Sequence, residues 1–129
     1  RIFPGVQVAA VYATLLRVAA TPQLEIQVLA EPMASPASPL RDDVLEAVSA
    51  AVHAQYPDVP VIPYMAPYGT DGKEIRAGGI PTYGVMGLFI KDSDQFAHGL
   101  NERVPVRGFY RALEHWYTIL HRLAGRPAA

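Results

Sequence analysis

The sequence predicts an α/β fold, because amphipathic helical segments alternate with short apolar runs of strand length. Over residues 39–124 the predicted order is helix, strand, helix, strand, helix, and the second strand is largely apolar on both faces. This order indicates helices layered on a sheet with at least partly parallel strands. Residues 1–29 differ: they predict a strand end, a helix and a strand, which is half of a small α+β sandwich.

The amino-terminal elements follow from spacing and from turn residues. Apolar residues recur at roughly helical spacing over residues 6–19, between the Pro4-Gly5 turn and Thr21-Pro22. Residues 24–29 alternate apolar with polar side chains and therefore predict a half-buried strand. Residues 1–3 have the character of a strand that begins before the chain does, so we expect a fragment or a processed product.

A Pro- and Ser-rich segment over residues 31–39 indicates a linker, and a second helix is predicted to follow it up to about Gln55. Ser38 is expected to cap this helix and Pro39 to occupy its first turn. Three carboxylates near its start favour the positive end of the helix dipole; they belong to Asp42, Asp43 and Glu46. The predicted buried face consists of Val44, Leu45, Val48, Ala51 and Val52.

The remaining elements are marked by glycine and proline. They are a strand over residues 59–64, a short helix after Gly69 that ends at Gly78-Gly79, a strand over 80–89, a loop over 91–103 and a helix over 104–124. Phe109, Tyr110, Trp116 and Tyr117 on the last helix are expected to form core against the sheet rather than a binding platform.

Composition excludes several classes of function. Half of the residues are hydrophobic and 18% are charged, which is typical of a globular domain rather than a disordered chain. The net charge of −1 gives no electrostatic footprint for nucleic acid or an anionic membrane. Without cysteine the chain has no disulfide, thiolate metal site or cysteine nucleophile, and this fits cytoplasm and periplasm equally.

His98 is the main candidate for chemistry. A neutral imidazole is a common metal ligand, and Gly99 beside it allows close approach of the loop backbone. Glu102 is near enough in sequence to hold the loop or the second ring nitrogen. One histidine is not a metal-site signature, however, and the alternative is a loop histidine in water.

A second candidate region starts at Gly69-Thr70-Asp71, where a helix opens after a predicted strand. Backbone N–H groups at such a start can bind a carboxylate or an oxyanion, although Thr70 or Asp71 could simply cap the helix. Arg76 can grip a carboxylate in two places, or it can be a solvated helix arginine. His53, His115 and His121 lie in helical patterns and are expected to be surface or packing residues.

The order of these motifs resembles the C-terminal end of the zinc-dependent aminoacylase and carboxypeptidase family. This family includes acetylornithine deacetylase, succinyl-diaminopimelate desuccinylase and glutamate carboxypeptidase. Residues 68–84 and 97–103 carry the resemblance, which is specific over residues 63–104. It implies that residues 1–32 are the second half of an inserted, ferredoxin-like lid (dimerisation) domain. Residues 33–129 would then be the C-terminal part of a zinc-exopeptidase-like catalytic domain.

The resemblance also implies roles for individual residues. In this family the histidine of a His-x-x-x-Glu loop before the last helix is a zinc ligand, and this role falls on His98. The other implied roles are substrate contacts by Gly69, Thr70, Arg76 and Arg1, and support of the site by Asp71 and Glu102. The complete enzymes hold two zinc ions, and a metal-bound water attacks an amide carbonyl with a glutamate as base.

The resemblance further implies a peptide or N-acyl amino acid substrate, a missing amino-terminal part and a homodimer formed through the lid domain. The other metal ligands and the base would precede Arg1, so no catalytic residue is assigned and we expect no amide hydrolysis by the isolated chain. The alternative is a non-catalytic α/β module that binds a ligand or mediates association. A regulatory amino-acid-binding domain, which would bind ligand without metal, is a third reading.

Overall fold

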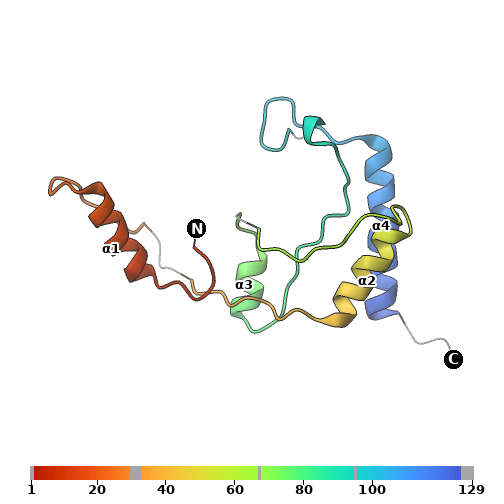
Figure 1. The fold of residues 1–129 in the computed structure, drawn as a ribbon, viewed down its shortest axis with the longest axis horizontal. Coiled ribbons are helices and arrows are strands. Elements are labelled where there is room, and N and C mark those ends of the chain that lie inside the picture. Colours follow the sequence, from red (N-terminus) through yellow and green to blue (C-terminus); the bar gives the residue numbers. More distant parts are fainter. Residues whose placement is uncertain (1, 30–32, 67, 95, 126–129) are drawn as a thin grey trace. The chain divides into compact units, whose positions relative to one another are not determined.

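The computed structural model describes residues 2–29, 33–66, 68–94 and 96–125, and the regular structure of these residues is helical (Figure 1). The elements are α1 (Val8–Ala19), α2 (Asp42–His53), α3 (Gly72–Ala77), the 3-10 turn η1 (Asp92–Asp94) and α4 (Val106–Ala124). The four predicted helices are therefore confirmed, with small differences at their ends. No helix in this part of the chain has the length and hydropathy needed to cross a bilayer.

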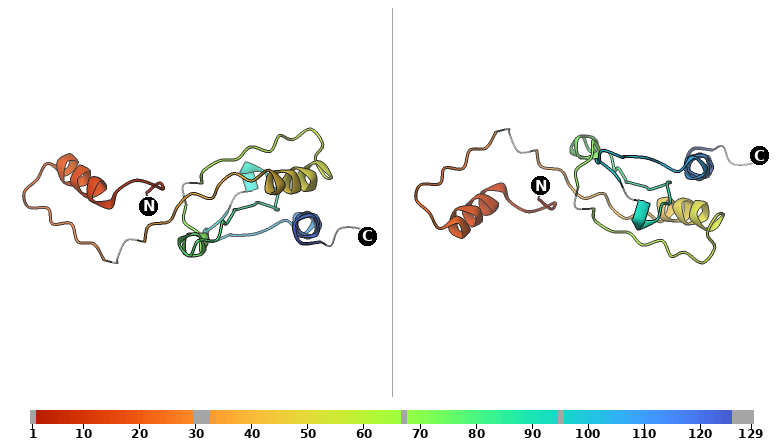
Figure 2. Two further views of the ribbon diagram at one scale, coloured as in Figure 1. Left: turned by 90° about the horizontal axis from the view of Figure 1, so that it is seen from below. Right: turned by 90° about the horizontal axis from the view of Figure 1, so that it is seen from above.

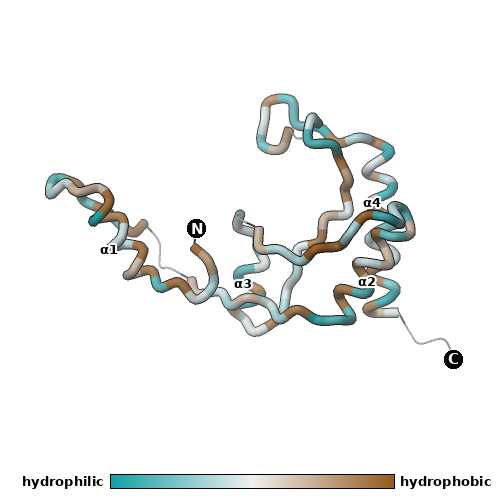
Figure 3. Tube along the Cα trace, in the orientation of Figure 1, coloured by the Kyte–Doolittle hydropathy of each residue, from teal (hydrophilic) through white to brown (hydrophobic). Residues whose placement is uncertain are grey.

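The predicted α/β fold is wrong for the described residues, which contain no strand and no sheet. The ferredoxin-like lid half is wrong for the same reason: residues 20–29 follow α1 as turn and coil. The segments 59–64 and 80–89, which the sequence predicts as strands, also run as coil (Figure 1). Figure 3 shows that part of the coil between α2 and α3 is nevertheless hydrophobic, so hydropathy by itself does not distinguish a strand from coil here.

Strand formation needs a partner, because the backbone groups of an isolated extended segment have nothing to pair with. Pro60 and Pro63 lack N–H groups, so the segment 59–64 could pair only incompletely. Gly84 and Gly87 weaken the segment 80–89 for a different reason, because glycine loses more conformational freedom on ordering. An apolar run of strand length is thus compatible with coil packed against a helix.

The chain divides into two compact units, and each is described by itself. The first unit comprises Arg1–Pro39 and Met65–Tyr83, and the second comprises Leu40–Tyr64 and Gly84–Ala129. The boundary predicted between residues 32 and 33 stays a prediction. Within the first unit α1 has no buried residue, and it ends at Ala20 in the left-handed conformation, with φ 48°.

Helix α3, in the first unit, ends at the two glycines that the sequence predicts as its stop. Gly79 adopts a φ of 87°, and its N–H donates to the Arg76 carbonyl at 2.9 Å. The next N–H, of Ile80, donates to the Ile75 carbonyl at 3.2 Å. These two bonds form a Schellman motif, which requires a left-handed residue and therefore favours glycine.

Ser38 does not cap a helix as predicted, because α2 begins later, after Arg41. Its hydroxyl instead donates to the Thr82 carbonyl and accepts from the Thr82 N–H, both at 2.8 Å. The Tyr83 hydroxyl donates to the Pro39 carbonyl at 2.7 Å. Side-chain hydroxyls thus join the segments 35–39 and 80–83 in place of a strand ladder.

The second unit is built on α2 and α4, which lie side by side (Figures 1 and 2). Its core contains Ala47, Ala51 and Ile119, with Val48 and Val85 packed against them. On α2 the predicted burial of Ala51 and Val52 is confirmed, whereas Val44, Leu45 and Val48 are only half-buried. The residues of α2 that face α4 are alanines, and because their side chains are small the two helices can approach closely.

Two further contacts order the second unit. The Tyr56 and Phe89 rings lie 4.7 Å apart, and the Gln55 amide donates to the Arg111 carbonyl at 2.9 Å.

At the start of α2, Asp43 pairs with Arg41 and accepts the N–H of Val44. The bond from Arg41 is the main reason that the pKa of Asp43 is lowered.

The prediction for the aromatic residues of α4 is wrong. Phe109, Tyr110, Trp116 and Tyr117 were expected in the core, but all four are exposed, with Tyr117 at 71%. The face of α4 that packs against α2 instead buries His115 and Ile119. The expected sheet is not found in the described residues, so these rings have no such surface to cover.

Candidate functional site

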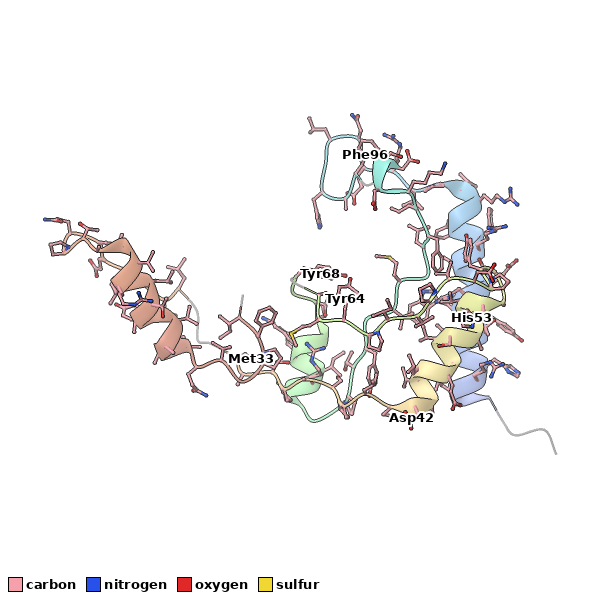
Figure 4. The ribbon with its side chains drawn as sticks, viewed as in Figure 1. Met33, Asp42, His53, Tyr64, Tyr68 and Phe96 are labelled. Carbon is pink, nitrogen blue, oxygen red and sulfur yellow. The ribbon has the colours of Figure 1, made fainter. Side chains whose placement is uncertain are left out.

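The candidate site in the second unit is the loop between η1 and α4, which carries His98. A tight turn closes this loop: the Gly99 N–H donates to the Phe96 carbonyl at 3.0 Å. Figure 4 shows Phe96 at the start of the loop, beside η1. A side-chain carbon on Gly99 would lie only 3.2 Å from the Phe96 carbonyl oxygen, so the turn favours glycine there. The local sequence therefore fixes the backbone on both sides of the histidine.

His98 occupies the third position of this turn with a φ of 61°. Positive φ is disfavoured for residues with a side chain, and turns of this kind prefer glycine or asparagine there. His98 is one of two residues other than glycine with positive φ in the described chain. Its side chain is exposed, so the strained backbone presents an imidazole to solvent. Backbone strain of this kind is concentrated at functional sites.

Arg103 holds the loop closed from its other end. Its guanidinium lies 3.7 Å from the centre of the Phe96 ring, and its Nη2 atom lies 3.7 Å from Asp94 Oδ1. A cation–π contact and an ion pair thus connect the end of the loop with its beginning. This role of Arg103 could not be predicted from the sequence, because nothing in the spacing of an arginine and a phenylalanine indicates that they will stack.

Glu102 supports the loop through its backbone. Its N–H donates to the Gly99 carbonyl at 3.2 Å, directly after the turn that contains His98. In the described residues the Glu102 carboxylate is exposed and has no hydrogen bond to the His98 ring. Glu102 was considered for holding the loop or the second ring nitrogen of His98. Its main chain helps to close the loop, and its carboxylate faces solvent.

The Gly69-Thr70-Asp71 turn belongs to the first unit and opens the six-residue helix α3. The Thr70 hydroxyl accepts the Gly72 N–H at 3.3 Å, and the Thr70 carbonyl accepts the Lys73 N–H at 3.2 Å. The Asp71 carbonyl accepts the Glu74 N–H at 3.2 Å, while the Asp71 side chain makes no capping bond. The first N–H groups of α3 therefore already have acceptors within the turn. Gly69 and Thr70 are exposed.

Arg76 is half-buried and bonds within its own unit. Its Nε atom donates to the Ser35 hydroxyl at 3.3 Å, and its Nη1 atom donates to the Thr82 carbonyl at 3.4 Å. A hollow of about 130 Å³ lies beside it, lined by residues of the segments 36–39 and 79–81. Ligand pockets usually measure about 300–1,000 Å³, so this hollow is too small for a dipeptide. Arg76 thus joins three segments and retains further N–H donors.

The described residues contain no cluster of three or more His, Asp or Glu side chains that could hold a metal ion. His98 therefore belongs to no such group in this part of the chain. His53 and His121 are exposed and His115 is buried, which confirms them as surface and packing residues. Arg1, the remaining predicted substrate contact, lies outside the described residues.

His115 differs from the other histidines because it is 1% exposed and neither ring nitrogen makes a hydrogen bond of ordinary geometry in the described residues. The ring meets Phe89 edge-on at 6.0 Å and Trp116 at 6.3 Å between centres. Burial, the larger effect, lowers the pKa of His115, and a weak hydrogen bond with the Ala51 backbone, outside ordinary hydrogen-bond geometry, partly opposes this. A ring in this position packs the helices and is closed to an external ligand.

Comparison with protein-family models, with curated proteins and with solved structures finds no match for the chain. The hydrolase family therefore stays a prediction that depends on the motifs and their order. The geometry adds a ranking of the candidate residues. His98 is exposed on a strained turn, whereas Thr70 and Arg76 form hydrogen bonds within their unit.

Proposed function

We propose that this chain is the C-terminal part of a zinc-dependent hydrolase that cleaves amide bonds of peptides or N-acyl amino acids. The observation that carries the proposal is the exposed imidazole of His98, held at a φ of 61° in a closed loop. The motif order from Gly69 to Arg103 supports the same function. Such strain persists only where the surroundings enforce it, and a ligand position is one reason to keep it.

The described residues alone do not fit a catalytic zinc centre, because such a centre needs three protein ligands and these residues offer no group of three. His98 would therefore be one ligand of a site completed by other parts of the enzyme. Two zinc ions are proposed for the whole enzyme, where bound metal would acidify the attacking water. The isolated chain is expected to be inactive toward amides.

The other residues of the chain would act on the substrate and on the loop. Arg76 has N–H donors beyond those that bind Ser35 and Thr82, and these suit a substrate carboxylate. Thr70 and Gly69 would contribute at the exposed turn before α3, and Asp71 would brace that turn. Arg103 and Glu102 would keep the His98 backbone in place.

The test is the metal content of the protein made from the complete reading frame that encodes this chain. Zinc should be present, and His98→Ala should lose a large part of it together with hydrolysis of N-acyl amino acids. His53→Ala is the matched control, because His53 is also exposed but lies at the end of α2. Full zinc content in His98→Ala, or equal loss in both variants, would contradict the proposal.

A second measurement uses the 129-residue chain itself, since a lone imidazole still binds zinc weakly. The ring resonances of the four histidines should be followed by NMR during addition of zinc chloride. No turnover of N-acyl amino acids or dipeptides is expected at any zinc concentration. Robust turnover by this chain, free of longer enzyme, would refute the assignment of the catalytic groups to other parts of the protein.

A further inference from the structure

Helix α4 carries an exposed apolar stripe, which we define by Val106, Phe109, Leu113, Trp116, Leu120 and Leu123. These six residues are between 39% and 72% exposed. They recur at spacings of three, four, three, four and three residues along the helix. From this stripe we infer that a second copy of the chain binds here, with the two α4 helices antiparallel.

The spacing is that of a heptad repeat, in which alternate steps of three and four keep apolar residues on one seam. Such a seam packs into a matching seam on another helix at a crossing angle of about 20°. The stripe spans α4 from its first residue, Val106, almost to its last, Ala124. It is therefore long enough to form a continuous helix–helix contact.

The stripe borders the face of α4 that packs inside the unit, and Leu123 at its end lines a shallow hollow together with Ala47 of α2. That face carries His115 and Ile119, which are buried against α2 together with Ala47 and Ala51. None of the six stripe residues belongs to the buried core of the second unit. Exposed apolar patches of this extent on soluble proteins mark interaction sites.

The stripe is complementary to itself when the second helix runs in the opposite direction. An antiparallel pair places Leu113 opposite Trp116 of the other copy, so a smaller side chain meets the largest ring. The same register places Phe109 opposite Leu120 and Val106 opposite Leu123. Each layer then combines positions of both heptad types, as antiparallel helix pairs require.

Charge does not oppose the binding of a second copy. In two-helix pairs, charged residues flanking the seam set the choice of partner. Here the flanking positions are uncharged: they are Tyr110, Ala112, Tyr117 and Ala124, together with Ile119, which is buried against α2. The whole chain has a net charge of −1, so two copies repel each other only weakly.

The available area is in the range that a dimer needs. With roughly 150–250 Å² on each large side chain, the exposed parts of the six stripe residues amount to about 600 Å² per copy. The flanking Tyr110 and Tyr117, 63% and 71% exposed, raise this to roughly 900 Å². Stable interfaces bury about 800 Å² per partner.

The first test is sedimentation velocity of the 129-residue chain across micromolar concentrations, with circular dichroism to confirm helicity. A monomer–dimer equilibrium is expected, and Leu113→Glu and Leu120→Glu should each raise its Kd by about tenfold or more. Leu100→Glu is the matched control, because Leu100 is fully exposed in the loop and lies off the stripe. A monomer at every concentration, or a dimer that both stripe variants leave unchanged, would overturn the inference.

The second test gives the direction of the helices, and it uses the absence of cysteine from the chain. Phe109→Cys and Leu120→Cys chains are mixed in equal amounts and oxidised under mild conditions. Antiparallel pairing predicts a mixed disulfide between the two variants, because these positions face each other. Disulfides formed only within each variant would contradict the antiparallel register.

Discussion

Two histidines of the second unit show how differently the same side chain can be placed. The His115 ring lies in the α2–α4 core, where neither nitrogen makes a hydrogen bond of ordinary geometry in the described residues and burial lowers its pKa. The His98 ring is exposed on a turn whose backbone is held at positive φ. The His115 ring is well packed but poorly hydrogen-bonded, whereas the His98 ring is exposed and its backbone is strained. Only the second leaves an imidazole available to a ligand.

The largest effect is expected from replacing His115. His115→Leu should raise the free energy of unfolding at pH 7 by about 1–3 kcal/mol, because it removes two buried polar atoms that make no hydrogen bond of ordinary geometry. Urea denaturation followed by the fluorescence of Trp116, the only tryptophan, measures this. A loss of stability would show that the ring has polar partners in solution.

The pH dependence of His115 provides a second comparison. Its folded pKa is lowered from the ordinary 6.5, so the unfolded chain takes up the proton first as the pH falls. The stability of the native protein should therefore decline as the pH drops through 6.5 toward the folded pKa. The free energy of unfolding of His115→Leu, measured over the same pH range, should change less. His53 and His121 remain in both proteins and serve as the internal control.

A smaller effect of opposite origin is expected at the loop. His98→Gly should stabilise the chain by about 0.5–1 kcal/mol, because glycine adopts positive φ without the strain that a side chain introduces. His98→Ala keeps a side-chain carbon and should give no such gain. Equal urea midpoints for the two variants would mean that the loop backbone carries no strain in solution.

The smallest effect is expected from Arg103, whose contacts are partly exposed. Arg103→Ala should reduce global stability by only about 0.5 kcal/mol, since exposed cation–π contacts and ion pairs contribute little. Hydrogen exchange at the Gly99 and Glu102 amides should nevertheless accelerate, because these bonds close the loop. Arg107→Ala, in the first turn of α4, is the control and should leave both amides unchanged.

The helices could be predicted because their signals are local. The two carboxylates at the start of α2 and the glycines after α3 act on their own helix ends. Strands could not be predicted in this way, because a strand depends on a partner that no local pattern reveals. In the sequence, Pro60 and Pro63 are the features that argue against a strand over residues 59–64.

Residue types were enough to propose the candidate site, but its conformation could not be predicted. The exposure of His98 follows from its place in a polar loop, whereas its positive φ could not be predicted, because turns of this kind favour glycine or asparagine. The bonds of Arg76 to Ser35 and Thr82 join segments far apart in sequence, so spacing could not indicate them. Arg103 was missed for the same reason.

The hydroxyl of Ser38 has a consequence for aggregation. It occupies both the N–H and the carbonyl of Thr82, the two groups by which an incoming chain would add itself as a neighbouring strand. A strand that pairs through its backbone leaves further N–H and C=O groups free to bind the next strand. A serine hydroxyl offers no such groups, so pairing does not continue beyond it. At Thr82, the segment 80–83 is therefore blocked from serving as a template for fibre growth.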